Sequence, residues 1–263
     1  MTTSTNAKTS TTIALVTGAN KGIGLEVARQ LGRRAATTVL LGARHPDRGA
    51  AAEKALRGEG IDAHHLPLDV TDERTIAAAA EQVEAEHGRL DVLVNNAAVP
   101  GAALAGKPSE TPPDALRQVF ETNVFGVVAV TNALLPLLRR SPAGRIVNVS
   151  SELGSIGAAL DPDSPCWPFV SIPYPTSKTA VNMITAMYAK ELADTPIKVN
   201  AANPGYCATD LNGHTGFRTA AQGAEAIVHL ATLADDGPTG SFHGHLWVND
   251  PAPDQPEYGS LRW

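Results

Sequence analysis

Cysteine, basic charge and long uninterrupted apolar runs are all scarce in this chain. Its 263 residues include only Cys166 and Cys207, which are too few for a disulfide framework and suit a reducing compartment. The formal net charge of −6 provides no basic surface for DNA or RNA. The longest apolar stretch, Val124 to Leu138, is interrupted by polar residues, glycine and proline and falls short of a bilayer span. We therefore expect neither a nucleic acid nor a membrane as a partner.

A polar segment precedes what we expect to be a single domain. Residues 1–11 lack an apolar core, so they predict a disordered tail and no signal peptide, which favours a cytoplasmic protein. With 43% hydrophobic residues, the chain has enough apolar side chains to bury one large core. Because no internal repeat divides residues 12–263, we predict one domain across this range.

The first apolar strand runs directly into a glycine-rich turn. Ile13 to Val16 is short, continuously apolar and rich in β-branched residues, as is typical of a strand buried on both faces of a parallel sheet. The spacing Gly-x3-Gly-x-Gly follows, and Leu25 to Arg34 then has apolar residues at helical intervals. In such a strand, turn and helix, the glycines let the backbone approach a pyrophosphate, and the helix N-terminus supplies free N–H groups. The predicted nucleotide-binding residues are Gly18, Asn20, Lys21, Gly22, Ile23 and Gly24; the alternative is a turn without a ligand.

The end of the second predicted strand indicates which nucleotide is bound. The strand at Thr38 to Leu41 is followed by Gly42-Ala43-Arg44, with no carboxylate to accept the 2′-hydroxyl of an adenosine ribose. An arginine at this position accommodates a 2′-phosphate instead, and Lys21 and Arg48 supply further positive charge. These residues predict NADPH as the cofactor. The alternative is that the three cations are solvated surface charges.

Strands and helices continue to alternate along the rest of the chain. Sequential units of this kind predict an α/β protein with a doubly wound, seven-stranded parallel sheet and helices on both faces. The further strands are expected near residues 64–68, 90–94, 144–149, 198–202 and 245–248, and the further helices near 47–57, 71–87, 115–139, 174–193 and 220–233.

Polar or small residues follow several of these strands, at the sheet edge where open parallel sheets bind ligands. Asp69 and Val70 are candidates for the adenine edge, although an aspartate before Thr71 also suits the start of a helix. Asn96 and Ala97 end the fourth strand, in a segment small enough for a cofactor to pass close to the backbone. The remaining candidates at strand ends are Ser150, Ser151, Pro204, Gly205 and Thr209.

Tyr174 and Lys178 lie four positions apart at the start of a predicted helix. This spacing places both side chains on one helix face, so the phenol and the ammonium can share a ligand. A nearby positive charge favours the tyrosinate anion, so we expect the pKa of Tyr174 to be lowered. The alternative is an ordinary pair on a helix face. His243 and His245 form a further spaced pair, but two histidines without acidic or cysteine partners do not make a metal site, and we predict no metal.

In this order the motifs resemble those of the short-chain dehydrogenase/reductase family, and most closely those of NADPH-dependent carbonyl reductases. The resemblance extends from about Thr12 to Trp263 and implies a single-domain Rossmann fold. Two details favour the carbonyl reductases, namely the segment Asn20 to Gly24 and the terminal tryptophan. The motifs are Thr17-Gly18-x3-Gly22-x-Gly24, Asn95-Asn96-Ala97-Ala98, Asn123, Ser151, Tyr174-x3-Lys178 and Pro204-Gly205.

The resemblance also implies a role for each site residue. Tyr174 would protonate the carbonyl oxygen of the substrate as hydride arrives, and Ser151 would orient that oxygen. Lys178 would hold the nicotinamide ribose and stabilise the tyrosinate, and Asn123 would position a water that links Lys178 to solvent. Thr209 would bind the carboxamide of the cofactor.

Two departures from the family pattern bear on the pocket. Ala98 stands where glycine is more usual, a change that should be tolerated. Ser151 and Tyr174 are 23 positions apart, about ten more than in typical members. The extra segment, Asp161 to Ile172, contains Cys166, Trp167 and Phe169 and is expected to cover part of the pocket. In some carbonyl reductases a longer insertion here blocks the helices used for oligomerisation, so we favour a monomer over a homodimer.

The function predicted from the sequence is therefore NADPH-dependent reduction of a small-molecule ketone or aldehyde. One alternative is an alcohol dehydrogenase that acts oxidatively on a sugar or secondary metabolite. Another is a catalytically silent sensor of NADPH, although such a protein has no need of Asn123, Ser151, Tyr174 and Lys178 together. The pocket walls come from loops, so the sequence does not identify the substrate.

Overall fold

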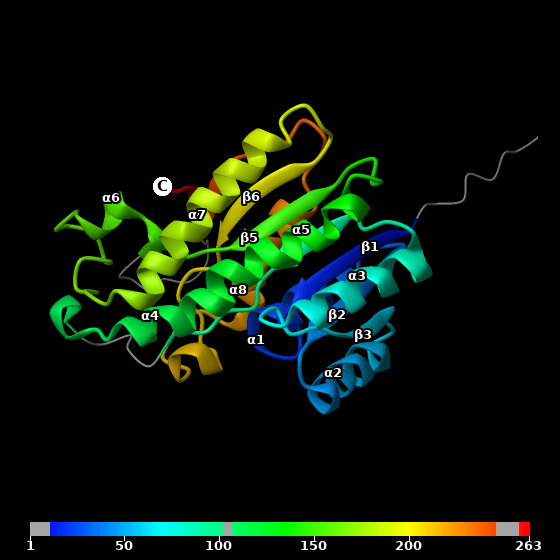
Figure 1. The fold of residues 1–263 in the computed structure, drawn as a ribbon, viewed down its shortest axis with the longest axis horizontal. Helices are drawn as coiled ribbons and strands as arrows, with labels where there is room; N and C mark the ends of the chain where they lie inside the picture. The colour runs from blue at the N-terminus through cyan, green and yellow to red at the C-terminus, as the bar shows by residue number, and fades with distance from the viewer. Residues whose placement is uncertain (1–10, 102–106, 246–257) are drawn as a thin grey trace, which may run out of the picture.

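Eight strands form a single sheet in the computed structural model, which describes residues 11–101, 107–245 and 258–263 (Figure 1). The strand order is β3-β2-β1-β4-β5-β6-β7-β8. The strands are β1 (Thr12–Thr17), β2 (Thr37–Ala43), β3 (Ala63–Pro67), β4 (Val92–Asn95), β5 (Arg145–Val149), β6 (Lys198–Asn203), β7 (Phe242–His245) and β8 (Tyr258–Ser260).

The first seven strands are parallel, as the alternating pattern predicted. The eighth strand was not predicted, because its three residues include no buried apolar side chain; it pairs with β7 in the antiparallel direction. The expected strand at 245–248 is also misplaced. β7 ends at His245, and residues 246–248 lie outside the described residues, as do residues 1–10 of the predicted tail.

Two hydrophobic cores, one on each face of the sheet, show that the fold is doubly wound. Alternate residues of β1 enter opposite cores: Ala14 and Val16 pack on one face, and Ile13 and Leu15 pack on the other. The first core is covered by α1 (Gly22–Gly32), α2 (Pro46–Gly58) and α8 (Ala220–Ala231). The second is covered by α3 (Glu73–His87), α5 (Gly126–Leu138) and α7 (Pro173–Glu191), which lie together on one face in Figure 1. The predicted α/β Rossmann fold is confirmed.

The helix expected at 115–139 is divided by one wider turn. It consists of α4 (Pro113–Phe120), a π-helical turn at Glu121–Phe125, and α5. Apolar periodicity alone does not reveal such a turn, which occurs often at functional sites. The run Pro113–Leu138 is apolar and long enough to span a membrane, but half of its most apolar window is buried inside the protein. Leu134, Leu137 and Leu138 of this run pack in the second core.

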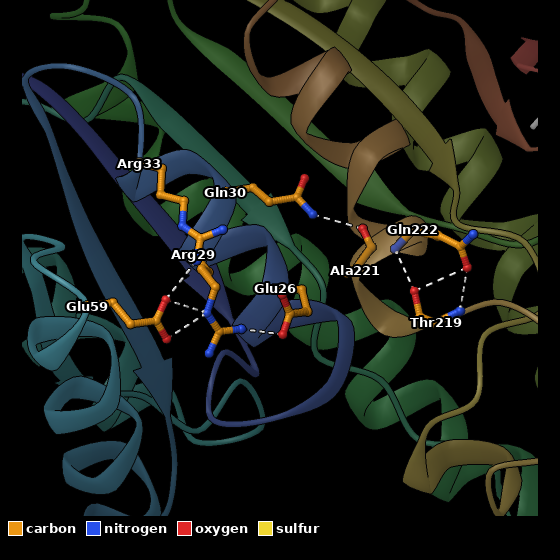
Figure 2. Close-up of polar contacts among 8 residues, drawn as sticks. All are labelled: Glu26, Arg29, Gln30, Arg33, Glu59, Thr219, Ala221 and Gln222. Carbon is orange, nitrogen blue, oxygen red and sulfur yellow. Dashed lines mark hydrogen bonds and ion pairs between the residues drawn. The ribbon is translucent and has the colours of Figure 1, made fainter.

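Polar contacts hold α1 against its neighbours and so orient the glycine turn at its N-terminus (Figure 2). Gln30 donates to the carbonyl oxygen of Ala221 at the start of α8 over 2.8 Å. Arg29 donates to Glu59, just beyond α2, over 2.9 Å and also pairs with Glu26. Because α1 is tied on both sides, its N-terminus keeps a defined position at the carboxyl end of β1.

Candidate active site

The glycines of the first turn are required by its geometry. Gly18 and Gly22 have φ angles of +65° and +57°, which side-chain-bearing residues rarely adopt. A Cβ atom at Gly24 would lie 2.5 Å from the carbonyl oxygen of Gly18. The turn is therefore a bare backbone cradle at a helix N-terminus, of the kind that accepts a pyrophosphate.

Thr17 joins this turn to the end of β4. Its hydroxyl accepts hydrogen bonds from the backbone nitrogens of Asn96 and Ala97, at 2.9 and 3.0 Å. The side chain of Asn96 in turn donates to the carbonyl oxygen of Thr17 over 2.8 Å. These contacts bring the ends of β1 and β4 together at the point where the strand order reverses, where doubly wound sheets bind dinucleotides.

A cleft of about 360 Å³ lies at this edge of the sheet. It brings together most of the residues predicted to bind the cofactor, and several that were not predicted. The predicted ones are Gly18, Asn20, Lys21, Gly22, Ile23, Gly24, Arg44, Asp69, Val70, Asn96, Ala97 and Thr209. The others include Leu68, Val99, Thr122 and Asp210, each close in sequence to a predicted residue or motif.

The positive charges of the cleft fall into two groups. Arg44 and Arg48 both line the cleft and are exposed, and neither forms an ion pair in the described part of the chain. Lys21 also lines the cleft, but its ammonium pairs with Asp210 at 2.5 Å. The glycine cradle and the two available guanidinium groups together fit a dinucleotide that carries an additional phosphate.

Asp69 has a structural contact as well as a place in the cleft. One of its carboxylate oxygens accepts from the backbone nitrogen of Thr71 at 3.0 Å and from the hydroxyl of the same residue at 2.8 Å. Asp72, not Asp69, caps α3. The carboxylate of Asp69 therefore shapes the turn before α3 from a position at the cleft wall.

A second cavity, of about 230 Å³, adjoins the first. Ile23, Asn96 and Thr209 line both spaces, so a ligand that fills the cleft reaches the cavity. The cavity contains most of the remaining predicted residues: Ser151, Tyr174, Lys178, Pro204 and Gly205. Its walls also include residues for which no role was predicted, among them Leu153, Tyr206, Cys207, Leu211, Asn212 and Thr215.

The two adjacent serines have different partners. Ser150 is almost fully buried, and its hydroxyl donates to Asn182 over 2.6 Å. Ser151 is partly exposed and shares a hydrogen bond with the side chain of Tyr174, on the first turn of α7. Ser151 and Tyr174 thus place two hydroxyl groups together in the cavity, where both can contact one carbonyl oxygen.

The pKa of Tyr174 differs in direction from the sequence-based expectation. Burial raises the pKa of Tyr174 to about 12, and the hydrogen bond with Ser151 offsets only part of that effect. The Lys178 ammonium does not offset this desolvation; burial lowers the pKa of Lys178 itself to about 8, so the lysine is still charged at neutral pH. The ammonium donates to the carbonyl oxygen of Val149 over 2.7 Å and lies 5.5 Å from the centre of the Tyr174 ring. At neutral pH the phenol is therefore protonated and able to act as an acid.

Replacing Lys178 with methionine is expected to stabilise the nucleotide-free protein. With a folded pKa near 8 against 10.5 in the unfolded chain, burying this ammonium costs roughly 3 kcal/mol below pH 8. The variant leaves the Val149 carbonyl without this donor, which costs about 1–2 kcal/mol. We expect a net gain of about 1–2 kcal/mol in the free energy of unfolding, measured with urea at pH 7.

The gain should shrink as the pH rises from 8 to 10.5, because the folded lysine is then neutral and the unfolded lysine gains less free energy from holding its proton as the pH approaches 10.5. Lys190, an exposed lysine on the same helix, provides the control through Lys190→Met. A Lys178→Met variant less stable than the parent at pH 7 would contradict the cost assigned to this buried ammonium.

Asn123 lies outside both cavities, in the π-helical turn. It is 1% exposed, and its amide group donates to the carbonyl oxygen of Val99 at 3.0 Å and to Ser177 at 3.1 Å. Its side-chain oxygen accepts from the nitrogen of Val99 at 2.8 Å. Asn123 therefore fastens the segment after β4 to α7. Because both amide hydrogens are engaged, a water held by Asn123 would have to donate to one of its oxygens.

The turn after β6 is shaped by its neighbours. Gly205 has a φ angle of +73°, and a Cβ atom there would lie 2.8 Å from Cδ of Arg218. Arg218 donates to Nε2 of the buried His245 over 3.0 Å, so this histidine is part of the support behind the turn. His243 lies beside His229, with ring centres 5.6 Å apart. Cys207, 4% exposed, forms part of the cavity wall.

The chain between Ser151 and Tyr174, which includes the extra segment Asp161 to Ile172, has little regular structure. It holds a 3-10 turn at Glu152–Gly154 and the short α6 (Ile156–Ala159), followed by turns up to α7. Phe169 reaches the wall of the second cavity, whereas Trp167 is 48% exposed and Cys166 is buried. The expectation that this segment contributes to the pocket rests on Phe169.

Comparison with known proteins connects this site to one family. The family model described as short chain dehydrogenase matches residues 12–217. The chain is 40% identical to the short-chain dehydrogenase anuI of Penicillium roqueforti, with 84% of this chain and 88% of that protein covered. It is 34% identical to carbonyl reductase [NADPH] 1 of Bos taurus, over 88% of this chain and 95% of that protein.

A solved structure agrees with these sequence matches. The NADPH-bound carbonyl reductase from chicken fatty liver superimposes with a TM-score of 0.77 at 26% identity, covering 89% of this chain and 96% of that one. The similarity therefore extends over most of the chain.

Proposed function

The chain belongs to the short-chain dehydrogenase family, and from that premise we propose that it is an NADPH-dependent oxidoreductase that reduces the carbonyl group of a small ketone or aldehyde to an alcohol. One observation carries the proposal. Ser151 and Tyr174 line one cavity and share a hydrogen bond, and Tyr174 is protonated at neutral pH, so it can donate a proton to a carbonyl oxygen held there. The NADPH-dependent carbonyl reductases among the similar proteins support reduction as the direction.

Residues of the cleft account for binding of the cofactor. The glycine turn would receive the pyrophosphate, Arg44 and Arg48 the 2′-phosphate, and Thr209 the carboxamide. The names of the bovine relative and of the chicken structure, both of which include NADPH, support this choice. When bound, NADPH supplies the hydride.

The chain's own residues orient the carbonyl and supply its proton. Ser151 holds the carbonyl oxygen against Tyr174, and Tyr174 transfers its phenolic proton to that oxygen. Lys178, held by the Val149 carbonyl, stabilises the tyrosinate that remains. Asn123 supports the path of the replacement proton, because it fastens α7 at Ser177, next to Lys178.

The test is the loss of reduced-nicotinamide absorbance when purified protein meets NADPH or NADH with a panel of ketones, aldehydes, diketones and quinones. Oxidation of NADPH in preference to NADH is the expected result. Nucleotide binding without turnover on any substrate would favour the silent sensor. Turnover only with alcohols and NADP⁺ would favour the oxidative dehydrogenase.

We further propose a cytoplasmic monomer with one domain across residues 12–263. The oligomeric state needs a direct test, because Met183 and Met187 on α7 are 61% and 48% exposed. The inserted segment therefore leaves this part of the helix uncovered. Light scattering coupled to size exclusion should give a mass near 27.4 kDa. A mass twice as large would replace the monomer with a homodimer.

A further inference from the structure

One ion pair connects two elements that line the nucleotide cleft. Lys21 precedes the first turn of α1, and Asp210 begins the 3-10 turn Asp210–Asn212 after β6. The two residues are 189 positions apart in sequence, and the ammonium and carboxylate are 2.5 Å apart. Because both side chains line the cleft, their contact joins its two sides.

The carboxylate is held in place by its own turn. Asn212 accepts from the backbone nitrogen of Thr209 over 3.3 Å and donates to the carbonyl oxygen of Cys207 over 2.8 Å, which stiffens the turn. His214 contacts the second oxygen of Asp210 at 2.9 Å. Hydrogen bonds from Lys21 and then His214 lower the pKa of Asp210, so the carboxylate is charged at neutral pH.

The position of Lys21 conflicts with the role expected for it. As a ligand of the 2′-phosphate, Lys21 should have a positive charge that no carboxylate neutralises, as Arg44 and Arg48 do in the described part of the chain. Instead it is neutralised by a carboxylate from the turn that also lines the second cavity through Thr209, Leu211 and Asn212. A carboxylate beside a site for phosphates is unfavourable unless it has another task.

We propose that Lys21 and Asp210 form a strap that joins the sides of the nucleotide cleft and slows the release of the cofactor. The strap slows the release of NADPH and NADH equally. The preference for NADPH over NADH comes from Arg44 and Arg48. This inference rests on the nucleotide site of the proposed function but not on its catalytic step. Because both side chains of the pair are 55% exposed, its effect is modest and sensitive to salt.

The decisive variant is Asp210→Asn, for which two explanations predict opposite signs. If Asp210 only repels phosphates, its removal slows the release of NADPH. If Asp210 is half of a strap, its removal speeds the release of NADPH and of NADH equally, by roughly two- to fivefold. Release is measured by stopped-flow fluorescence as bound reduced nucleotide is displaced by excess oxidised nucleotide, at low and high salt.

Lys21→Gln and the double variant complete the cycle. The double variant should release both nucleotides no faster than Asp210→Asn does, since each single change already opens the strap. Asp114→Asn is the matched control, because it breaks a surface ion pair with Arg117 that is also 2.5 Å long and lies outside the cleft. This control should leave both release rates unchanged.

Three results overturn the strap. They are slower release from Asp210→Asn, an effect confined to NADPH, and release rates equal to those of the parent in both single variants. A parent protein that binds neither nucleotide would instead overturn the proposed function, and with it the strap. A parent that binds nucleotide without turnover leaves the release measurements, and hence the test, intact.

Discussion

Replacing Tyr174 with phenylalanine is expected to lower carbonyl turnover by about a thousandfold while NADPH affinity stays within about twofold of the parent. The substitution removes one hydroxyl from a cavity that holds the proposed acid and leaves the ring in place. Ser151 still reaches the carbonyl oxygen, but no group remains there to donate a proton with the required geometry. The measurement pairs steady-state turnover with a fluorescence titration of NADPH.

Tyr188→Phe provides the control for this experiment. Tyr188 lies on the same helix, and its hydroxyl donates to Asn132 over 2.7 Å, outside both cavities. The control loses one hydrogen bond and should retain full turnover. If Tyr174→Phe turns over at more than about a tenth of the parent rate, Tyr174 is not the acid.

Replacing Arg44 with aspartate is expected to weaken NADPH binding by about a hundredfold and NADH binding by only a fewfold. A charge-assisted contact with the 2′-phosphate is lost and the new carboxylate repels that phosphate, whereas NADH carries a 2′-hydroxyl there and loses no such contact. Dissociation constants for both nucleotides, measured at one salt concentration, give the change in preference.

Arg34→Asp is the matched control for charge. Arg34 lies beyond the end of α1, away from the cleft, so the same reversal of charge there should change the two affinities little. Equal losses of NADPH and NADH in Arg44→Asp would show that Arg44 is only a surface charge. In that case Arg48 alone would be left to contact the 2′-phosphate.

Local patterns in the sequence account for most of the architecture. The apolar run before Gly18 and the helical spacing after it are properties of neighbouring residues, and they predicted β1, the turn and α1. β8 escaped prediction because its pairing depends on β7, not on its own side chains. The π-helical turn at Asn123 escaped because one extra residue in a turn leaves the apolar period almost unchanged.

The candidate site was predicted as a set of residues but not as an electrostatic environment. Residues that follow parallel strands meet at one edge of the sheet, so their position in sequence was enough to bring Ser151 and Thr209 together, whereas Tyr174 reaches them from the start of α7. The walls contributed by Tyr206, Leu211 and Thr215 come from an irregular segment, for which no period exists to be recognised.

The sequence by itself determined the α/β alternation, the glycine cradle and the spacing of Tyr174 and Lys178, because each depends on residues a few positions apart. Only the tertiary structure decided the electrostatic properties of the charged and titratable groups. Burial raised the pKa of Tyr174 and lowered that of Lys178, and Lys21 forms an ion pair with Asp210, which lies 189 positions away in sequence. Desolvation and ion pairing depend on everything that surrounds a group in space, and no local pattern contains that information.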